Sequence, residues 1–132
     1  LLAGLATLGL VSIAVARQAG TRWGIVAGLL LLAIPDFSLY AIRGQMDAPI
    51  ALLITAQLLT FLAGLHHPRW HGAGGIIFGL AILTKGMAAG LAFLAQVAYM
   101  ILARDFRPLR QRAWWVAIIL GIALALPWHL HQ

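Results

Sequence analysis

Six apolar runs, separated by short polar breaks, fill most of this 132-residue sequence. They cover residues 1–16, 24–40, 48–65, 73–83, 86–103 and 113–126. A helix needs about 20 apolar residues, with a range of about 17–25, to cross a bilayer. The second, third and fifth runs reach that range, whereas the fourth and sixth must borrow flanking residues. None alternates with a period of two, so the sequence predicts an all-α polytopic transmembrane helical bundle of about six helices.

The composition excludes a soluble globular domain. Hydrophobic residues make up 63% of the chain and charged residues 9%, against about 45–50% and about 25% in an average soluble domain. The net charge of +6 would by itself favour a nucleic-acid partner. A chain this apolar has too little water-facing surface for a basic groove, so we expect it to meet membrane lipids and no nucleic acid.

Missing residue types limit the chemistry within the chain. With no cysteine, it has no disulfide framework, thiolate zinc site or cysteine nucleophile. It contains no glutamate, so any carboxylate chemistry falls to Asp36, Asp47 or Asp105. His67 and His71 have the spacing of zinc ligands on a helix, but no third ligand is evident and a plain interfacial loop is favoured. We therefore predict no cofactor and no metal ion.

The two ends of the sequence favour a piece of a larger protein. The chain starts with Leu1 rather than Met, inside an apolar run that no basic segment precedes, so no signal peptide is predicted. It stops just after another apolar run. We expect residues 1–132 to be one transmembrane region from the interior of a larger membrane domain.

The basic residues predict the orientation in the membrane. Five loops and a tail connect or follow the six runs, on alternating sides. The first, third and fifth loops hold Arg17, Arg22, Arg69, Arg104, Arg107, Arg110 and Arg112. The second loop, the fourth loop and the tail hold only Arg43 and Lys85. The positive-inside rule places the arginine-rich side in the cytoplasm. The apolar runs are flanked by tryptophans, as interfacial anchors are: Trp23, Trp70, Trp114, Trp115 and Trp128.

Three ionisable residues on the outer side are candidates for function. Asp47 stands two residues before Pro49, which suits a helix N-cap favoured by the helix dipole, but it could also bind a sugar hydroxyl, a metal or a basic partner. Lys85 lies in a break of two or three residues between apolar helices. It could simply extend its ammonium to the interface, or meet a lipid phosphate there. Arg43 is the natural second cation, because a guanidinium matches phosphate geometry.

Other outer-side and mid-helix residues carry weaker signals. His129 follows Trp128 and is either a hydrogen-bonding residue at the rim of a site or an interface anchor. Gln57 and Gln96 fall in the middle of apolar runs, where we expect hydrogen bonds between helices. Pairs of glycines four residues apart predict close helix packing: Gly24/Gly28, Gly75/Gly79 and Gly86/Gly90.

Several short motifs, in their order along the chain, resemble a known family. They read Arg43-Gly-Gln-Met-Asp-Ala-Pro-Ile, then His67-Pro-Arg-Trp, then Gly79-Leu-Ala-Ile-Leu-Thr-Lys-Gly, and finally Ala125-Leu-Pro-Trp-His. Together they resemble the GT-C superfamily of polytopic membrane glycosyltransferases, in particular the protein mannosyltransferase and aminoarabinose transferase branch. The resemblance covers nearly the whole chain.

The resemblance implies an activity and a set of roles. Such enzymes pass a sugar from a polyprenyl-phosphate carrier to an acceptor lipid, protein or glycan, with inversion at the glycosidic bond. Lys85 and Arg43 would hold the carrier phosphate, and Asp47 would orient the sugar or the basic residues. Trp128 and His129 would line the cavity near the donor.

The resemblance also implies where the chemistry lies. The family's general base is a carboxylate of its first outer loop, which would precede residue 1. We therefore expect no catalytic residue within this chain, and no activity from the fragment alone. The protein would sit in a bacterial inner (plasma) membrane, with its active side facing the periplasm or exterior.

Two other classes remain open. A multi-helix transporter or flippase also gathers a few polar residues inside a bundle, although we see none of the related halves that transporters often have. A non-catalytic membrane subunit predicts no clustering of Arg43, Asp47 and Lys85.

Overall fold

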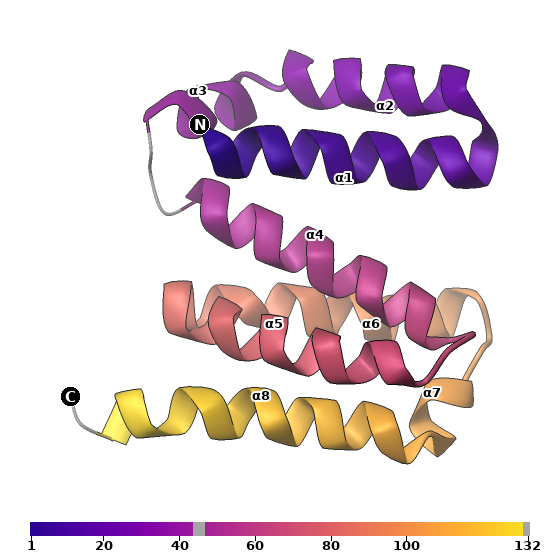
Figure 1. Cartoon of the computed structure of the whole chain (residues 1–132), viewed down its shortest axis with the longest axis vertical. Helices are drawn as coiled ribbons and strands as arrows, with labels where there is room; N and C mark the ends of the chain where they lie inside the picture. Colours follow the sequence, from indigo (N-terminus) through magenta and orange to yellow (C-terminus); the bar gives the residue numbers. More distant parts are fainter. Residues whose placement is uncertain (44–46, 131–132) are drawn as a thin grey trace. The chain divides into compact units, whose positions relative to one another are not determined.

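The computed structural model describes residues 1–43 and 47–130, except for the side chains of Tyr40 and His129, and the described residues form helices joined by short turns (Figure 1). The elements are α1 (Leu2–Ala19), α2 (Thr21–Ala33), α3 (Pro35–Arg43), α4 (Asp47–Gly64), α5 (Arg69–Lys85), the 3-10 helix η1 (Gly86–Ala89), α6 (Gly90–Leu102), α7 (Arg107–Arg110) and α8 (Arg112–Leu130). The predicted all-α bundle is confirmed.

The helices form two compact units. Unit 1 covers Leu1–Thr55 and unit 2 covers Ala56–Gln132, so the boundary falls within α4. Unit 1 therefore contains α1, α2, α3 and the first half of α4, and unit 2 contains the remaining elements.

In unit 1, α2 turns back along α1 through Gly20, whose φ of +99° suits glycine. A Cβ built on Gly24 would lie 2.6 Å from the Ser12 carbonyl oxygen, and one on Gly28 would lie 2.5 Å from the Ser12 hydroxyl. The predicted packing role of this glycine pair is confirmed. The second apolar run is broken between Ala33 and Pro35, where α2 and α3 meet at a 77° bend, because a proline ring disfavours helical backbone just before it.

In unit 2, α5 and α8 pack against each other along an extensive contact. Small residues line it on both helices: a Cβ built on Gly75 would lie 2.5 Å from the Ala117 carbonyl oxygen, and one on Gly79 would lie 3.0 Å from the Gly121 carbonyl oxygen. Without side chains between them, the two backbones approach closely. Gly75 meets residue 117, and Gly79, one turn later on α5, meets residue 121, one turn later on α8. The two helices therefore run parallel.

The chain reverses direction between α5 and α6, which run in opposite senses in Figure 1. The reversal occurs at Gly86, where φ is +52° and ψ is −114°. A Cβ built on Gly86 or on Gly90 would meet no atom within 4 Å. The prediction that these two glycines form a packing pair is therefore wrong. Gly86 is instead needed for its backbone conformation, which side chains other than hydrogen disfavour.

Membrane spans are fewer than the six apolar runs. Three helical stretches are long and apolar enough to cross a membrane: Leu2–Ala19, Asp47–Gly64 and Arg69–Leu102. The bent pair α2 and α3 makes a fourth if counted as one span, and the apolar part of α8, Arg112–Trp128, is shorter. The fourth and fifth runs fall in one helical stretch of 34 residues, Arg69–Leu102, which the reversal at Gly86 divides into two shorter legs.

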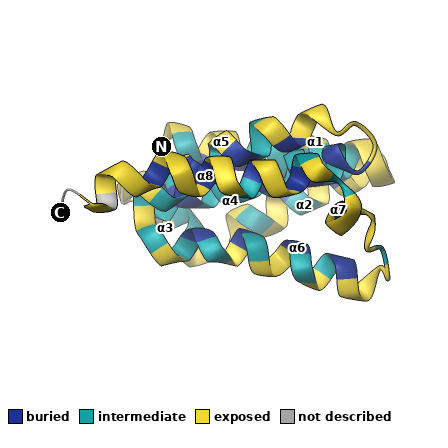
Figure 2. Ribbon diagram, turned by 90° about the horizontal axis from the view of Figure 1, so that it is seen from below, coloured by how far each residue is buried: buried dark blue, intermediate teal, exposed yellow. Residues whose placement is uncertain are grey.

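The surface of both units carries many large apolar side chains, drawn as exposed in Figure 2. Leu29 is 61% exposed and Ile119 is 64% exposed. Such a surface suits lipid, because acyl chains are as apolar as leucine and impose no cost on it. The buried core of unit 2 is a cluster of Phe61, Leu65, Met100 and Trp114, from α4, α6 and α8. The chain is thus an integral membrane protein in composition and in surface.

Candidate functional site

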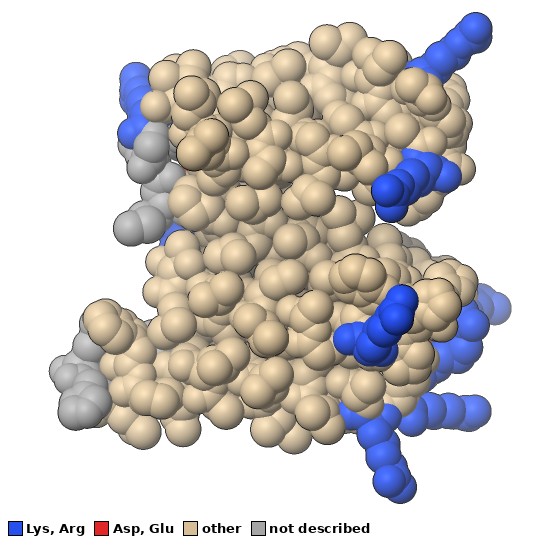
Figure 3. Space-filling view, in the orientation of Figure 1, with Lys and Arg blue, Asp and Glu red and all other residues tan. Residues whose placement is uncertain are grey.

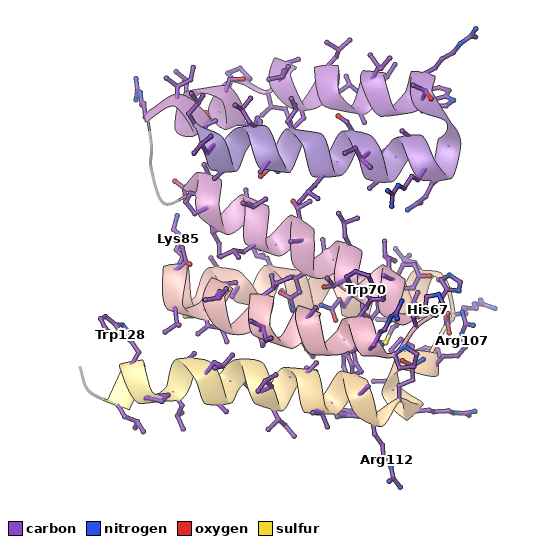
Figure 4. All side chains as sticks on the ribbon, in the orientation of Figure 1. His67, Trp70, Lys85, Arg107, Arg112 and Trp128 are labelled. Atoms are coloured by element: carbon purple, nitrogen blue, oxygen red, sulfur yellow. The ribbon has the colours of Figure 1, made fainter. Side chains whose placement is uncertain are left out.

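Lys85 and Trp128 lie at the same end of unit 2, opposite Arg107 and Arg112 (Figure 4). Their position follows from the parallel packing of α5 and α8. The register that aligns 75 with 117 and 79 with 121 brings residue 85 level with residue 127. Lys85 ends α5, and the exposed Trp128 stands near the end of α8. Two of the predicted site residues, 43 positions apart in sequence, therefore lie at the same end of unit 2.

The end of α5 determines the placement of Lys85. The Gly86 N–H donates to the Ile82 carbonyl oxygen and closes the last turn. The Thr84 hydroxyl donates a hydrogen bond to the Leu80 carbonyl oxygen at 2.7 Å, so its hydrogen is taken up by a bond within α5. A cation in the last turn is favoured by the partial negative charge at a helix C-terminus. Lys85 is the one lysine or arginine at this end of the described part of unit 2.

Arg43 and Asp47 belong to unit 1. Arg43 is exposed in the last turn of α3, and Asp47 is half-buried as the first residue of α4. The position of Asp47 at the start of α4 agrees with the predicted capping role, since a carboxylate there is favoured by the helix dipole. The three residues between them lie outside the described part of the chain, as does the side chain of His129. Whether these residues share a site with Lys85 therefore stays a prediction.

Basic side chains lie at the helix ends of each unit, and the stretch between them is uncharged on the face in Figure 3. In unit 1, Arg17 and Arg22 flank the α1–α2 turn. Arg43 lies at the other end, because Ala41 of α3 packs against Gly4 near the start of α1. In unit 2, five arginines lie opposite Lys85: Arg69, Arg104, Arg107, Arg110 and Arg112. Within each unit, the predicted segregation of charge is confirmed.

Asp105 is committed to an ion pair at the arginine-rich end. Its carboxylate accepts hydrogen bonds from Arg107 Nε at 2.8 and 3.0 Å, from Arg107 Nη2 at 2.6 Å and from the Arg107 backbone N–H at 3.1 Å. These hydrogen bonds lower the pKa of Asp105 and raise that of Arg107. Asp36 lies exposed in the first turn of α3. Within unit 2, Asp105 therefore lies at the end opposite Lys85.

A buried polar cluster in unit 2 was only partly foreseen from the sequence. The Trp114 indole N–H donates to Gln96 Oε1 at 3.0 Å, linking α8 to α6 and confirming the predicted interhelical role of Gln96. His71 Nε2 lies 2.7 Å from Gln111 Oε1. Gln57 is also buried. The only signal for this cluster in the sequence was the pair of glutamines inside apolar runs.

Two sequence interpretations fail at this cluster. Trp114 and His71 are each 3% exposed, so the prediction of Trp114 as an interfacial anchor is wrong, and so is that of His71 as part of an interfacial loop. Trp114 is buried because its ring stacks on Phe93, with centroids 5.9 Å apart. His71 lies inside α5, where the absence of a side chain on Gly64 leaves room for its ring. Its neighbour His67 stays exposed. Among the described residues, no group of three metal-binding side chains occurs.

Comparison with known proteins identifies the family. The family model described as dolichyl-phosphate-mannose-protein mannosyltransferase matches residues 1–131, which is nearly the whole sequence. The chain belongs to this family. It therefore belongs to the GT-C superfamily of membrane glycosyltransferases, as the motifs around Lys85 and Trp128 indicate.

A curated relative agrees with this assignment. The chain is 28% identical over 109 residues to the undecaprenyl phosphate-alpha-4-amino-4-deoxy-L-arabinose arabinosyl transferase of Shewanella sediminis. The match covers 77% of this chain and 19% of the relative, so the chain spans about a fifth of the length of that protein. No solved structure matches the chain.

Proposed function

We propose that this chain forms the donor-phosphate side of a glycosyltransferase that moves a sugar from a polyprenyl-phosphate carrier to an acceptor on the outer face of the membrane. The observation that carries the proposal is that Lys85 and Trp128 lie at the same end of the α5–α8 pair, away from the arginines of unit 2. The family, and a relative whose name specifies an undecaprenyl phosphate donor, support it.

The proposed chemistry follows from the charges. When the sugar leaves its carrier, negative charge builds on the phosphate oxygen, and a cation held beside that oxygen lowers the barrier. Lys85 supplies such a cation from a helix end, and Arg43 supplies a second with a geometry that suits two phosphate oxygens. Asp47 orients the sugar or the basic residues. Trp128 and His129 line the donor cavity, with the Trp128 indole offering an apolar and hydrogen-bonding surface.

The catalytic base lies outside this chain in our proposal. Of its three aspartates, Asp105 is paired with Arg107, and Asp36 lies in the first turn of α3, seven residues before Arg43. Residues 1–132 then form one transmembrane region of a larger membrane domain, which brings the carboxylate to the acceptor. The acceptor is a lipid, a protein or another glycan.

The same proposal sets the orientation in the membrane. The arginine-rich ends of both units lie in the cytoplasm, according to the positive-inside rule. The Lys85 end then faces the periplasm or exterior of a bacterial inner membrane. A donor phosphate at the outer surface meets Lys85 there without a charge entering the apolar middle of the bilayer, where it would be costly.

Replacing Lys85 in the full-length protein tests the proposal. Lys85→Ala should lower the rate of sugar transfer from the polyprenyl-phosphate donor by about 10²–10³-fold, the size typical for loss of one charge-stabilising donor. Lys85→Arg should recover part of that rate. The matched control is Arg112→Ala, which removes an exposed cation from the opposite end of the same helix pair and should leave transfer unchanged. Unimpaired transfer by Lys85→Ala would refute the assignment.

A further inference from the structure

A small space lies among four helices of unit 2. Its volume is about 20 Å³, and it is lined by residues of α4, α5, α6 and α8. Polar residues on its wall are Gln57, His71 and Gln96, and aromatic residues are Phe61, Phe78 and Trp114. A cavity needs about 10–15 Å³ to hold one water molecule, together with two to four polar partners. The space is therefore the size of one water and has the walls that a water requires.

Gln57 supplies an unsatisfied acceptor to this space. Its side chain is 7% exposed, and its Oε1 accepts no hydrogen bond from any residue in the described part of the chain. An unpaired amide oxygen is costly anywhere in a protein interior. Inside a membrane, the surrounding hydrocarbon cannot lower the free-energy cost of the unpaired Gln57 oxygen, because it has no hydrogen-bond donor.

The other two polar residues offer complementary groups. Since the Trp114 indole is only a donor, its bond to Gln96 assigns the oxygen of that amide and leaves the Gln96 NH₂ group as a donor. His71 Nε2 lies 2.7 Å from Gln111 Oε1; where that amide oxygen accepts, Nε2 carries the hydrogen and Nδ1 remains as a hydrogen-bond acceptor. One water molecule can donate one hydrogen bond to Gln57 Oε1 and one to His71 Nδ1, and can accept a third from the Gln96 NH₂ group.

We propose that a single structural water occupies this space and joins Gln57 of α4 to His71 of α5 and Gln96 of α6. With the direct Gln96–Trp114 bond, the water completes a polar network that ties α4, α5, α6 and α8 together. The network lies inside a bundle whose other contacts are mainly apolar. Its role is to hold the four helices in one arrangement, and it is independent of the donor-phosphate site.

The test uses thermal unfolding of the full-length protein in lipid nanodiscs. Gln57→Leu and Gln57→Met both remove the acceptor with little change in volume. If a water satisfies Gln57, these variants strand the water and lower the unfolding midpoint by about 2–8 °C, the shift expected for loss of one buried bond in a domain of this size. If the space holds no water, the same variants remove an unpaired polar atom and leave the midpoint unchanged or raise it, which overturns the proposal.

A double-variant comparison separates the water from a general packing effect. Gln96→Leu alone lowers the midpoint because it breaks the bond to Trp114. If the water links the two glutamines, the fall for Gln57→Leu with Gln96→Leu is smaller than the sum of the single falls. Additive falls contradict the link. Should the variants fail to fold, a wild-type crystal structure that resolves ordered water decides: density within hydrogen-bond distance of Gln57 Oε1 supports the proposal, and its absence overturns it.

Discussion

The two ends of unit 2 use their charged residues differently. At one end, five arginines accompany a compact set of polar contacts, including the Asp105–Arg107 ion pair and the bond from the Trp115 indole to the Leu109 carbonyl oxygen. At the other end, Lys85 is the last residue of α5, and the hydroxyl of the preceding Thr84 donates to the Leu80 carbonyl oxygen of the same helix. The first end has the arginines and two exposed tryptophans, Trp70 and Trp115, that suit a membrane interface, whereas the second end has one cation, Lys85, and the exposed Trp128. The net charge sums both ends and hides this difference. The contrast sets the arginines, which we expect to orient the protein in the membrane, apart from Lys85, which we propose binds the donor phosphate.

The largest expected effect on stability comes from the glycine contact that aligns these ends. Gly75→Ala should destabilise the protein by about 3 kcal/mol, the upper part of the range for overpacking, because the new methyl group would meet the Ala117 backbone at 2.5–3.0 Å. The unfolding midpoint in nanodiscs measures this. Gly72→Ala is the control: it lies on the same helix, its Cβ meets nothing within 4 Å, and its higher helix propensity should slightly stabilise the chain. Equal midpoints for the two variants would contradict the α5–α8 register.

A somewhat smaller effect is expected at the reversal that ends α5. Gly86→Ala should cost about 1–2 kcal/mol, because a side chain is strained at φ +52° even where space is open. It should also impair sugar transfer by displacing Lys85. The control is Gly90→Ala, where φ is −60° and ψ is −23°, which should be neutral or stabilising. If both variants had wild-type stability and transfer rates, the reversal would not position Lys85.

The buried bond between α6 and α8 should have a moderate effect. Trp114→Phe removes the indole N–H that donates to Gln96 and keeps an aromatic ring against Phe93. Hydrogen bonds between membrane helices contribute about 0.6 kcal/mol on average, with a maximum near 1.7 kcal/mol, so the loss should fall in that range. Trp115→Phe is the matched control, since the Trp115 indole bonds to a carbonyl at an exposed position. A larger loss for the control would mean that burial does not strengthen the Gln96 bond.

The smallest effect is expected at the arginine-rich end. Asp105→Asn should lower the midpoint by at most a few degrees at neutral pH, because exposed ion pairs contribute little. Since folding lowers the pKa of Asp105, through its hydrogen bonds with Arg107, the stabilisation is present above the ordinary carboxyl pKa. It is lost as the pH falls through the lowered value. Midpoints of the variant and the wild type should therefore converge in acid, and a gap that widens there would contradict the ion pair.

Sequence reasoning was reliable where one dominant force acts. The apolar runs predicted the helical class, because a backbone in lipid must satisfy its own hydrogen bonds. The arginine count predicted the segregated ends, and the two glycine pairs at 24/28 and 75/79 predicted close contacts that the structure confirms. Motifs around Lys85 indicated the family that nearly the whole chain matches.

Sequence reasoning failed where two roles share one residue type. Tryptophan and histidine serve as membrane anchors or as buried hydrogen-bonding groups, and Trp114 and His71 proved buried. Glycine permits either close packing or an unusual backbone conformation. Gly86 uses the second, although its spacing to Gly90 suggested the first. Which role a residue takes depends on the helix that packs against it. The local sequence does not specify which helix that is.

By itself, the sequence determined that this protein is a helical membrane protein, which ends of its helices carry the arginines, and to which family it belongs. Those properties depend on composition and on local order along the chain. The tertiary structure decided that α5 and α8 run parallel in a register that brings Lys85 level with the end of α8, and that Gln57, His71 and Gln96 line one polar space. Those properties depend on which side chains meet across helices that are distant in sequence. The register of α5 and α8 follows from the close packing of their backbones at glycines, which hydrophobicity alone does not specify.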